Sequence, residues 1–365
     1  MQPLAGNALG VNRPMSARAF RKPVNWGKRK LNRLLCALYA WRQADIARNK
    51  PFDAIFEMSS SCNLKCPLCN TGGLRNEFRH VERGAMKFST FKAALDKLLP
   101  EIEHLTLYNW GEPFLNQDLF RCIEYATRRE VTTQLSTNMM LLGIERAQKV
   151  IASGLTLMIV SCDGLTQETY GRYRAGASLE KLIAHVDELI ALKRSLRSPL
   201  PRIRMQFIVF KHNEHEMDEF NRFWLTRGAD DVDFIRMSFM SIPGEEIARK
   251  QGWIPDDPDY QPFHPYGTLK RCGYLYHHVT INYNGDWYTC CFPSGETDYR
   301  IGNLVTDDFW EVWNGEYYRY CRRLLREQRV PPGRFEAMCH DCTGVFPQRE
   351  DVKRYWRTSA LGRSR

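Results

Sequence analysis

Residues 53–70 read D-A-I-F-E-M-S-S-S-C-N-L-K-C-P-L-C-N. The first six residues form an apolar run of strand length, and Cys62, Cys66 and Cys69 follow it in a C-x3-C-x2-C pattern. Because cysteine is the usual ligand of iron–sulfur clusters, three thiols this close in sequence predict a metal centre on the loop after the first strand. A zinc site is the alternative, although zinc usually takes four ligands in paired C-x2-C form.

The same alternation of short strands and helices continues along the chain. Apolar runs of strand length occur at 53–58, 103–108, 131–136, 156–161, 203–210 and 231–237. Helical patterns lie between them, near 89–99, 116–129, 143–153, 178–196 and 214–227. This order predicts an α/β protein with a parallel sheet, and six strands predict a partial (β/α)6 TIM-like barrel over residues 51–240. In such folds, ligands bind at the loops after the strands.

The regions outside the predicted barrel differ in composition. We expect a basic arm at 1–50, a proline-rich linker at 241–270, a small cysteine-rich unit at 271–345 and a basic tail at 346–365. No stretch of about 18 apolar residues is present, and the N-terminus lacks the apolar core of a secretory signal. The sequence therefore predicts a cytoplasmic protein, in which 12 cysteines do not form a disulfide framework.

Positive charge is concentrated in the N-terminal arm. The chain has 52 Lys and Arg against 42 Asp and Glu, and residues 1–50 hold 11 of the former against Asp45 alone. Apolar residues recur there at helical spacing, at Leu31, Leu34, Leu35, Leu38 and Trp41. This predicts a basic amphipathic helix that either contacts an anionic membrane peripherally or packs its apolar stripe on the main domain. We favour packing, and we expect no specific nucleic-acid partner.

The cysteine loop resembles the signature of the radical S-adenosylmethionine superfamily. Over residues 51–345 the chain is similar to members with a C-terminal SPASM or twitch auxiliary-cluster domain. The resemblance implies a [4Fe–4S] cluster held by Cys62, Cys66 and Cys69, with S-adenosylmethionine on its open iron. It also implies one auxiliary [4Fe–4S] cluster and an electron donor such as flavodoxin or ferredoxin.

Three later loops resemble cofactor-binding segments of that superfamily. They are N-W-G-E-P, S-T-N and S-C-D-G, each directly after a predicted strand. The residues that the resemblance assigns to S-adenosylmethionine are Gly111, Glu112, Pro113, Ser136, Asn138, Ser161 and Asp163. Short polar side chains such as these suit recognition of hydroxyl groups.

The C-terminal cysteines resemble the opening of a SPASM domain. Cys272, Gly285 and Cys290 form a C-x12-G-x4-C pattern, and Cys339 and Cys342 form C-x2-C. The resemblance implies that these four cysteines ligate the auxiliary cluster, while a four-cysteine zinc ribbon is the alternative. The runs V-T-I-N-Y and W-Y-T-C, separated by N-G-D, predict a β-hairpin.

Three function classes remain. The favoured class is a radical enzyme, an oxidoreductase or epimerase, that removes a hydrogen atom from a carbohydrate-like or other small molecule, with a lipid-linked saccharide among the candidates. Cys291 adjoins Cys290, and three roles are open for it: an alternative cluster ligand, a packing residue, or the hydrogen donor for epimerisation. The second class modifies a peptide or protein, although 50 N-terminal residues leave little room for a leader-peptide-binding domain. The third is a non-enzymatic zinc-binding module for nucleic acid.

Overall fold

The computed structural model describes residues 24–73, 83–237, 247–261, 272–291 and 299–327, together with Ala337 and Cys339. These residues form one nine-stranded sheet in the order β6-β5-β4-β3-β2-β1-β7-β8-β9. The strands are β1 (Asp53–Phe56), β2 (His104–Thr106), β3 (Thr132–Thr137), β4 (Leu157–Ser161), β5 (Arg202–Ile208), β6 (Asp231–Ile235), β7 (His278–Ile281), β8 (Asp286–Tyr288) and β9 (Gly302–Asn303). Strands β1 to β7 pair in parallel, which confirms the predicted α/β class.

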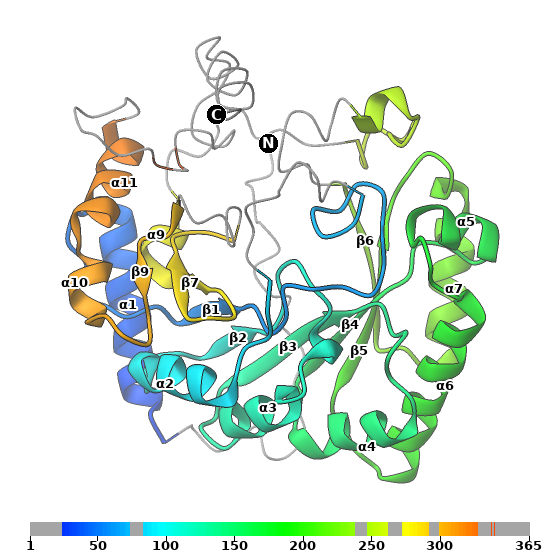
Figure 1. Cartoon of the computed structure of the whole chain (residues 1–365), viewed down its shortest axis with the longest axis horizontal. Coiled ribbons are helices and arrows are strands. Elements are labelled where there is room, and N and C mark those ends of the chain that lie inside the picture. The colour runs from blue at the N-terminus through cyan, green and yellow to red at the C-terminus, as the bar shows by residue number, and fades with distance from the viewer. Residues whose placement is uncertain are drawn as a thin grey trace.

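Helices cover the outer side of this curved sheet (Figure 1). The predicted helices are present as α2 (Phe88–Leu98), α3 (Leu119–Thr127), α4 (Ile144–Ser153), α6 (Leu179–Ser195) and α7 (Met217–Arg227). Further helices are η2 (Pro113–Leu115), α5 (Gln167–Tyr173), η3 (Glu214–Glu216), α9 (Tyr274–His277), α10 (Phe309–Trp313) and α11 (Glu316–Glu327). None of the described helices is both long and apolar enough to cross a membrane.

The two faces of the sheet differ in character. Along β3 and β5 burial alternates with the strand period, so that residues such as Leu135 and Phe207 are buried beneath the helices. Residues at the alternate positions, such as Gln134 of β3 and Arg204 of β5, point to the inner face and stay partly exposed. Parallel sheets are usually apolar and covered on both faces. The polar inner face is therefore a surface left open for a ligand.

The C-terminal unit extends the same sheet beyond β1. Strand β7 pairs in parallel with β1, and the carboxylate of Asp53 lies 2.5 Å from Nδ1 of His278 across this junction. The predicted hairpin is confirmed, because β8 returns antiparallel to β7 through a turn in which Gly285 has a φ of 91°. Much of the predicted linker and all of the predicted tail lie outside the described residues, so the domain bounds stay predictions.

The N-terminal helix is present as α1 (Trp26–Arg42), but the prediction that its apolar stripe packs on the main domain is wrong. Leu31, Leu34, Leu38 and Trp41 are 59%, 60%, 38% and 64% exposed. Amphipathic spacing identifies a helix and its two sides, but it does not determine which side is covered. In this protein the polar side packs inward.

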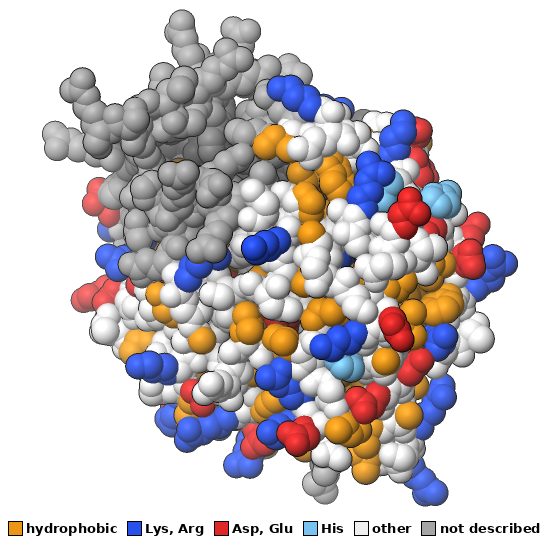
Figure 2. All heavy atoms as spheres, turned by 45° about the vertical axis from the view of Figure 1, so that its right-hand side comes forward, with side chains coloured by type: hydrophobic (Ala, Val, Ile, Leu, Met, Phe, Trp, Pro, Cys, Tyr) orange, Lys and Arg blue, Asp and Glu red, His pale blue; other side chains and the backbone are white. Residues whose placement is uncertain are grey.

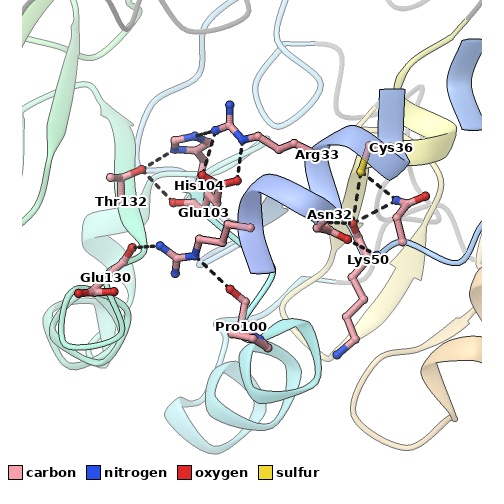
Figure 3. Close-up of polar contacts among 11 residues, drawn as sticks. Asn32, Arg33, Cys36, Lys50, Pro100, Glu103, His104, Glu130 and Thr132 are labelled. Carbon is pink, nitrogen blue, oxygen red and sulfur yellow. Dashed lines mark hydrogen bonds and ion pairs between the residues drawn. The ribbon is translucent and has the colours of Figure 1, made fainter. Parts of the chain in front are cut away.

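That polar side is anchored by hydrogen bonds to backbone carbonyls (Figure 3). Arg29 is 5% exposed and donates to the carbonyls of Pro100, Arg129 and Glu130 at 3.0, 3.2 and 2.9 Å. Asn32, also buried, exchanges two hydrogen bonds of 2.9 Å with the backbone of Lys50. A buried guanidinium supplies the partners that these carbonyls would otherwise lack, and so helix α1 is part of the folded domain.

Replacing Arg29 tests this arrangement. We expect Arg29→Ala to lower the free energy of unfolding by roughly 2–4 kcal/mol, because it removes charge-assisted bonds from a buried guanidinium to three backbone carbonyls. Leu34→Ala, on the exposed side of the same helix, should change it by less than about 0.5 kcal/mol. Urea denaturation of both variants measures the difference, and equal effects would contradict the assignment of the inward side.

Candidate active site

The three-cysteine loop coils on itself directly after β1. The amide of Cys69 donates to the carbonyl of Cys66 at 3.2 Å, and the amide of Gly73 donates to the same carbonyl at 2.9 Å. Gly72 and Gly73 permit this turn, since an added Cβ would lie 2.5 Å from the Cys66 oxygen and 2.1 Å from the Pro67 oxygen. The coil brings Cys62, Cys66 and Cys69 close enough that their thiols sense one another's charge.

Two of these thiols, Cys62 and Cys66, are poor anions without a cationic partner. Burial, together with the charges of the other two cysteines, raises the pKa of Cys66 to about 11, and burial also raises the pKa of Cys62. Among the described residues, no three His, Cys, Asp or Glu side chains converge closely enough to hold one metal ion. A four-iron cube is wider than a single ion and takes thiolate ligands, so three neighbouring thiols that do not converge on one point fit such a cluster.

The loop after β2 lies directly against the loop after β1. An added Cβ at Gly111 would lie 1.9 Å from the carbonyl oxygen of Ser59 and 2.6 Å from that of Ser61. The next amide, of Glu112, donates to the Ser61 carbonyl at 2.8 Å. Only glycine permits this approach, so the position that matches the predicted motif also sets the distance between the two loops.

A second contact between these loops comes from Glu57, which the sequence analysis did not single out. Its buried carboxylate accepts hydrogen bonds from the amides of Asn109 and Trp110, at 3.3 and 2.7 Å. Burial raises the pKa of Glu57 to about 7, against the opposing effect of these amide donors. Glu57 thus fixes the backbone just before Gly111, although a glutamate at a strand end carries no sequence signal of this role.

Glu112 performs the corresponding task between the loops after β2 and β3. Its carboxylate accepts from the amides of Phe114 and Asn138 and from the hydroxyl of Thr137, at 3.2, 2.9 and 2.8 Å. Burial raises the pKa of Glu112 to about 6. Because its hydrogen-bonding capacity is used within the protein, Glu112 acts on the site by holding the backbone around it.

Polar groups of the next two loops lie side by side. The hydroxyls of Ser136 and Ser161 are 3.2 Å apart, each at the carboxyl end of its strand. The side-chain amide of Asn138 donates to Asn63 at 2.9 Å and lies 3.9 Å from the sulfur of Cys62. The predicted residues after β1, β3 and β4 are thus brought to one edge of the sheet.

Asp163 is fully buried and paired within the protein. Its carboxylate accepts from the guanidinium of Arg174 at 2.5 Å and from the amide of Ile208 at 2.7 Å. Burial disfavours the charge of Arg174, but Asp163 outweighs it and holds the pKa of Arg174 well above its usual range. Arg174, which the sequence analysis also missed, is close enough to Cys66 that its charge lowers the pKa of that thiol.

The described C-terminal cysteines form a second group of neighbours. Cys272 and Cys290 both affect the pKa of Cys291, which a hydrogen bond with Cys290 lowers. Cys339 senses the charge of Cys290 and is hydrogen-bonded to Cys321 of α11, and this contact together with burial raises the pKa of Cys339. Cys342 lies outside the described residues. The neighbourhood of Cys321 was not predicted, since this cysteine lies outside both sequence patterns.

Side chains from three parts of the chain meet over the inner face. Tyr108, just after β2, is partly buried, and this desolvation raises its pKa to about 12. The charged groups that influence it are Cys291 of the C-terminal unit, Arg204 of β5 and Asp233 of β6. The carbonyl of Cys291 also accepts from the side chain of Asn109 at 3.0 Å. The C-terminal unit therefore contributes to the space enclosed by the partial barrel.

Comparison with known proteins supports this arrangement. Residues 272–343 match the family model described as SPASM, an iron–sulfur cluster-binding domain. The tungsten-containing aldehyde ferredoxin oxidoreductase cofactor-modifying protein of Pyrococcus furiosus is 26% identical, over 79% of this chain and 86% of its own. Mycofactocin maturase MftC of Mycobacterium ulcerans is 23% identical, over 74% and 77%. In fold, the chain is similar to SuiB of Streptococcus suis, with a TM-score of 0.59 at 14% identity over 93% of this chain and 84% of that one.

The chain is a radical S-adenosylmethionine enzyme with a SPASM-type domain. Its cofactors are S-adenosylmethionine and [4Fe–4S] clusters. This identification excludes the zinc-binding nucleic-acid module as the function of the chain. It leaves the substrate open, because the relatives named above act on different molecules.

The close approach at Gly111 gives a direct test of the site. We expect Gly111→Ala to lower cleavage of S-adenosylmethionine by about 100-fold, because the new methyl group forces apart two loops of a radical S-adenosylmethionine enzyme by about 1 Å. Gly27→Ala is the matched control, since no atom lies within 4 Å of its added Cβ. Chromatography of 5′-deoxyadenosine after reduction with dithionite measures both, and a wild-type rate in Gly111→Ala would contradict the geometry.

Proposed function

We propose that Cys62, Cys66 and Cys69 hold the catalytic [4Fe–4S] cluster and leave its fourth iron open to S-adenosylmethionine. When bound, this pair supplies a 5′-deoxyadenosyl radical that can remove a hydrogen atom from a substrate. The supporting observation is the self-coiled loop with three neighbouring thiols. The positive charge of Arg174 nearby favours the thiolate form that a cluster requires.

The loops after β2, β3 and β4 form the proposed cradle for S-adenosylmethionine. The hydroxyls of Ser136 and Ser161 and the amide of Asn138 supply polar contacts, and Gly111 and Pro113 supply backbone contacts. Glu112 and Asp163 act as positioning residues in this proposal, because their carboxylates are bound to other groups of the protein.

Cys272, Cys290, Cys339 and Cys342 are the proposed ligands of one auxiliary [4Fe–4S] cluster. Two relations support the first three: Cys339 senses the charge of Cys290, and both Cys272 and Cys290 lie near Cys291. Cys321 of helix α11 is hydrogen-bonded to Cys339. We assign Cys321 the role of a buried neighbour of the cluster.

The proposed substrate is a hydroxyl-rich small molecule, such as a saccharide, a lipid-linked saccharide or an aminocyclitol. The polar inner face of the partial barrel carries this proposal. Gln134 donates to Thr106 at 2.8 Å and Arg204 is paired with Asp231 at 2.7 Å, and both pairs are partly exposed. Side chains that both donate and accept hydrogen bonds match hydroxyl groups better than apolar ones.

Two outcomes are open to a substrate radical in this space. Loss of one electron and one proton gives dehydrogenation, and return of a hydrogen atom to the opposite face gives epimerisation. Cys291 is the proposed hydrogen donor for epimerisation, because it borders the inner face near Tyr108.

Modification of a peptide or protein is the alternative, and a specific comparison favours it. SuiB has been solved in complex with its precursor peptide SuiA, and MftC is named a maturase. We further propose that a flavodoxin or ferredoxin supplies the electrons, and that the protein is cytoplasmic and contacts an anionic membrane.

Deuterium transfer distinguishes the two substrate classes. With ring-deuterated sugars and aminocyclitols, we expect the 5′-deoxyadenosine formed to gain one mass unit. Peptides deuterated at Cα and Cβ should transfer no deuterium to it. Arg204→Ala should reduce this transfer by at least about tenfold while substrate-free cleavage of S-adenosylmethionine continues. Arg202→Ala, two residues earlier at the first position of the same strand, is the control. Transfer from the peptides alone would establish the alternative.

A further inference from the structure

The outer side of α1 carries an exposed apolar ridge, defined here as Leu31, Leu34, Leu38 and Trp41. Between 38% and 64% of each residue is exposed. With 3.6 residues per turn, positions 31, 34, 38 and 41 fall on one side of the helix, so the ridge is continuous over three turns. Exposed leucines are common singly, but an aligned set of this kind marks an interaction surface.

Basic side chains flank the ridge on both sides. Helical spacing puts Lys30 along one margin and Lys28 and Arg42 along the other. All three are exposed, and none of them forms an ion pair with another described residue. Their charges are therefore available to an anionic partner.

The ridge cannot turn inward without breaking the fold. Arg29, Asn32 and Cys36 lie on the opposite side of α1 and are 5%, 5% and 3% exposed. Arg33, at the edge, forms a 2.6 Å ion pair with Glu103, and the buried residues bind backbone carbonyls of distant segments (Figure 3). The helix presents one fixed side, so no rearrangement is needed before a partner binds.

We propose that this ridge docks the enzyme on the surface of an anionic lipid bilayer. A helix whose apolar side chains are bordered by Lys and Arg lies in the interface, with the apolar residues in the acyl boundary and the charges among the headgroups. Tryptophan favours that depth. The remainder of the chain, residues 51–365, has 41 basic and 41 acidic residues. Figure 2 shows side chains of both signs intermixed on the face of the molecule that it draws. With 11 basic residues against Asp45, the arm holds the whole net charge of +10.

A second copy of the chain is a poorer occupant of the ridge. A symmetric dimer through α1 would place Lys28, Lys30 and Arg42 against the same residues of the partner, and like charges would oppose association. A bilayer containing anionic lipid neutralises all of them at once.

Docking and chemistry occupy different ends of the strands. Arg29 and Arg33 contact segments that precede β2 and β3, whereas the cysteine loop follows β1. The docking proposal therefore does not depend on the proposed substrate, and its test needs no turnover.

Flotation of the full-length protein with vesicles tests the proposal. At 50 mM salt, we expect the protein to float with vesicles of equal phosphatidylglycerol and phosphatidylcholine, and to partition at least about tenfold less onto phosphatidylcholine alone. Raising the salt to 0.5 M should release most of it, because screening weakens the basic contacts. Brominated phosphatidylglycerol should quench tryptophan fluorescence, and Trp41→Phe should remove that quenching.

Two triple variants distinguish binding through the ridge from nonspecific binding by other exposed apolar residues. Leu34→Ser, Leu38→Ser and Trp41→Ser together should lower binding at least about tenfold while the melting temperature stays near the wild-type value. The matched control combines Ile144→Ser, Leu196→Ser and Trp310→Ser, which are also 42–57% exposed but lie on other elements, and should float like the wild type.

Three results would overturn the proposal. The first is failure of the wild type to float at low salt. The second is undiminished flotation of the ridge variant, which would leave the charges of the arm as the sole cause. The third is a stable dimer without vesicles that the ridge variant converts to monomer, which would assign the ridge to a second copy.

Discussion

Two buried carboxylates hold together the loops on which the rest of the site depends. Glu57 binds the amides of the loop after β2, and Glu112 in that loop binds the backbone and the hydroxyl of the loop after β3. Each carboxylate joins two loops beyond the ends of their strands, where the hydrogen bonds of the sheet no longer hold the backbone. A buried carboxylate that accepts several amide hydrogen bonds has only one favourable arrangement, so the spacing of these loops is fixed before any cofactor binds. Gly111 completes the constraint, since its missing side chain permits the contact.

The molecule puts polar groups in two places where parallel α/β proteins usually put apolar ones. The inner face of the sheet is polar and partly exposed, and the inward side of α1 is polar and buried. In the first place the groups pair with one another and remain partly exposed. In the second they satisfy carbonyls that precede β2 and β3, as Arg29 does. The same placement leaves the apolar side of α1 exposed, so the stability of the helix and its availability to a partner have one cause.

Much of the fold could be predicted from the sequence, because strands and helices differ in the period of their apolar residues. The six barrel strands, their helices and the C-terminal hairpin followed from that period. The three-thiol loop and Gly111 were found because their spacing is local. Glu57, Arg174 and Cys321 were not, since their partners lie 52, 11 and 18 residues away and only the folded chain brings them together. The inward side of α1 was missed for the same reason, as the carbonyls bound by Arg29 are about 70–100 residues distant.

The central claim is that one loop of three cysteines holds the cluster that cleaves S-adenosylmethionine, while a separate cysteine set holds another. Iron and sulfide analysis after anaerobic reconstitution, combined with an assay for 5′-deoxyadenosine, tests it most directly. The account predicts about eight irons in the wild type and about four in each of two variants, Cys62→Ala/Cys66→Ala/Cys69→Ala and Cys272→Ala/Cys290→Ala. Only the first variant should lose cleavage entirely. Formation of 5′-deoxyadenosine by that first variant at the wild-type rate would contradict the account.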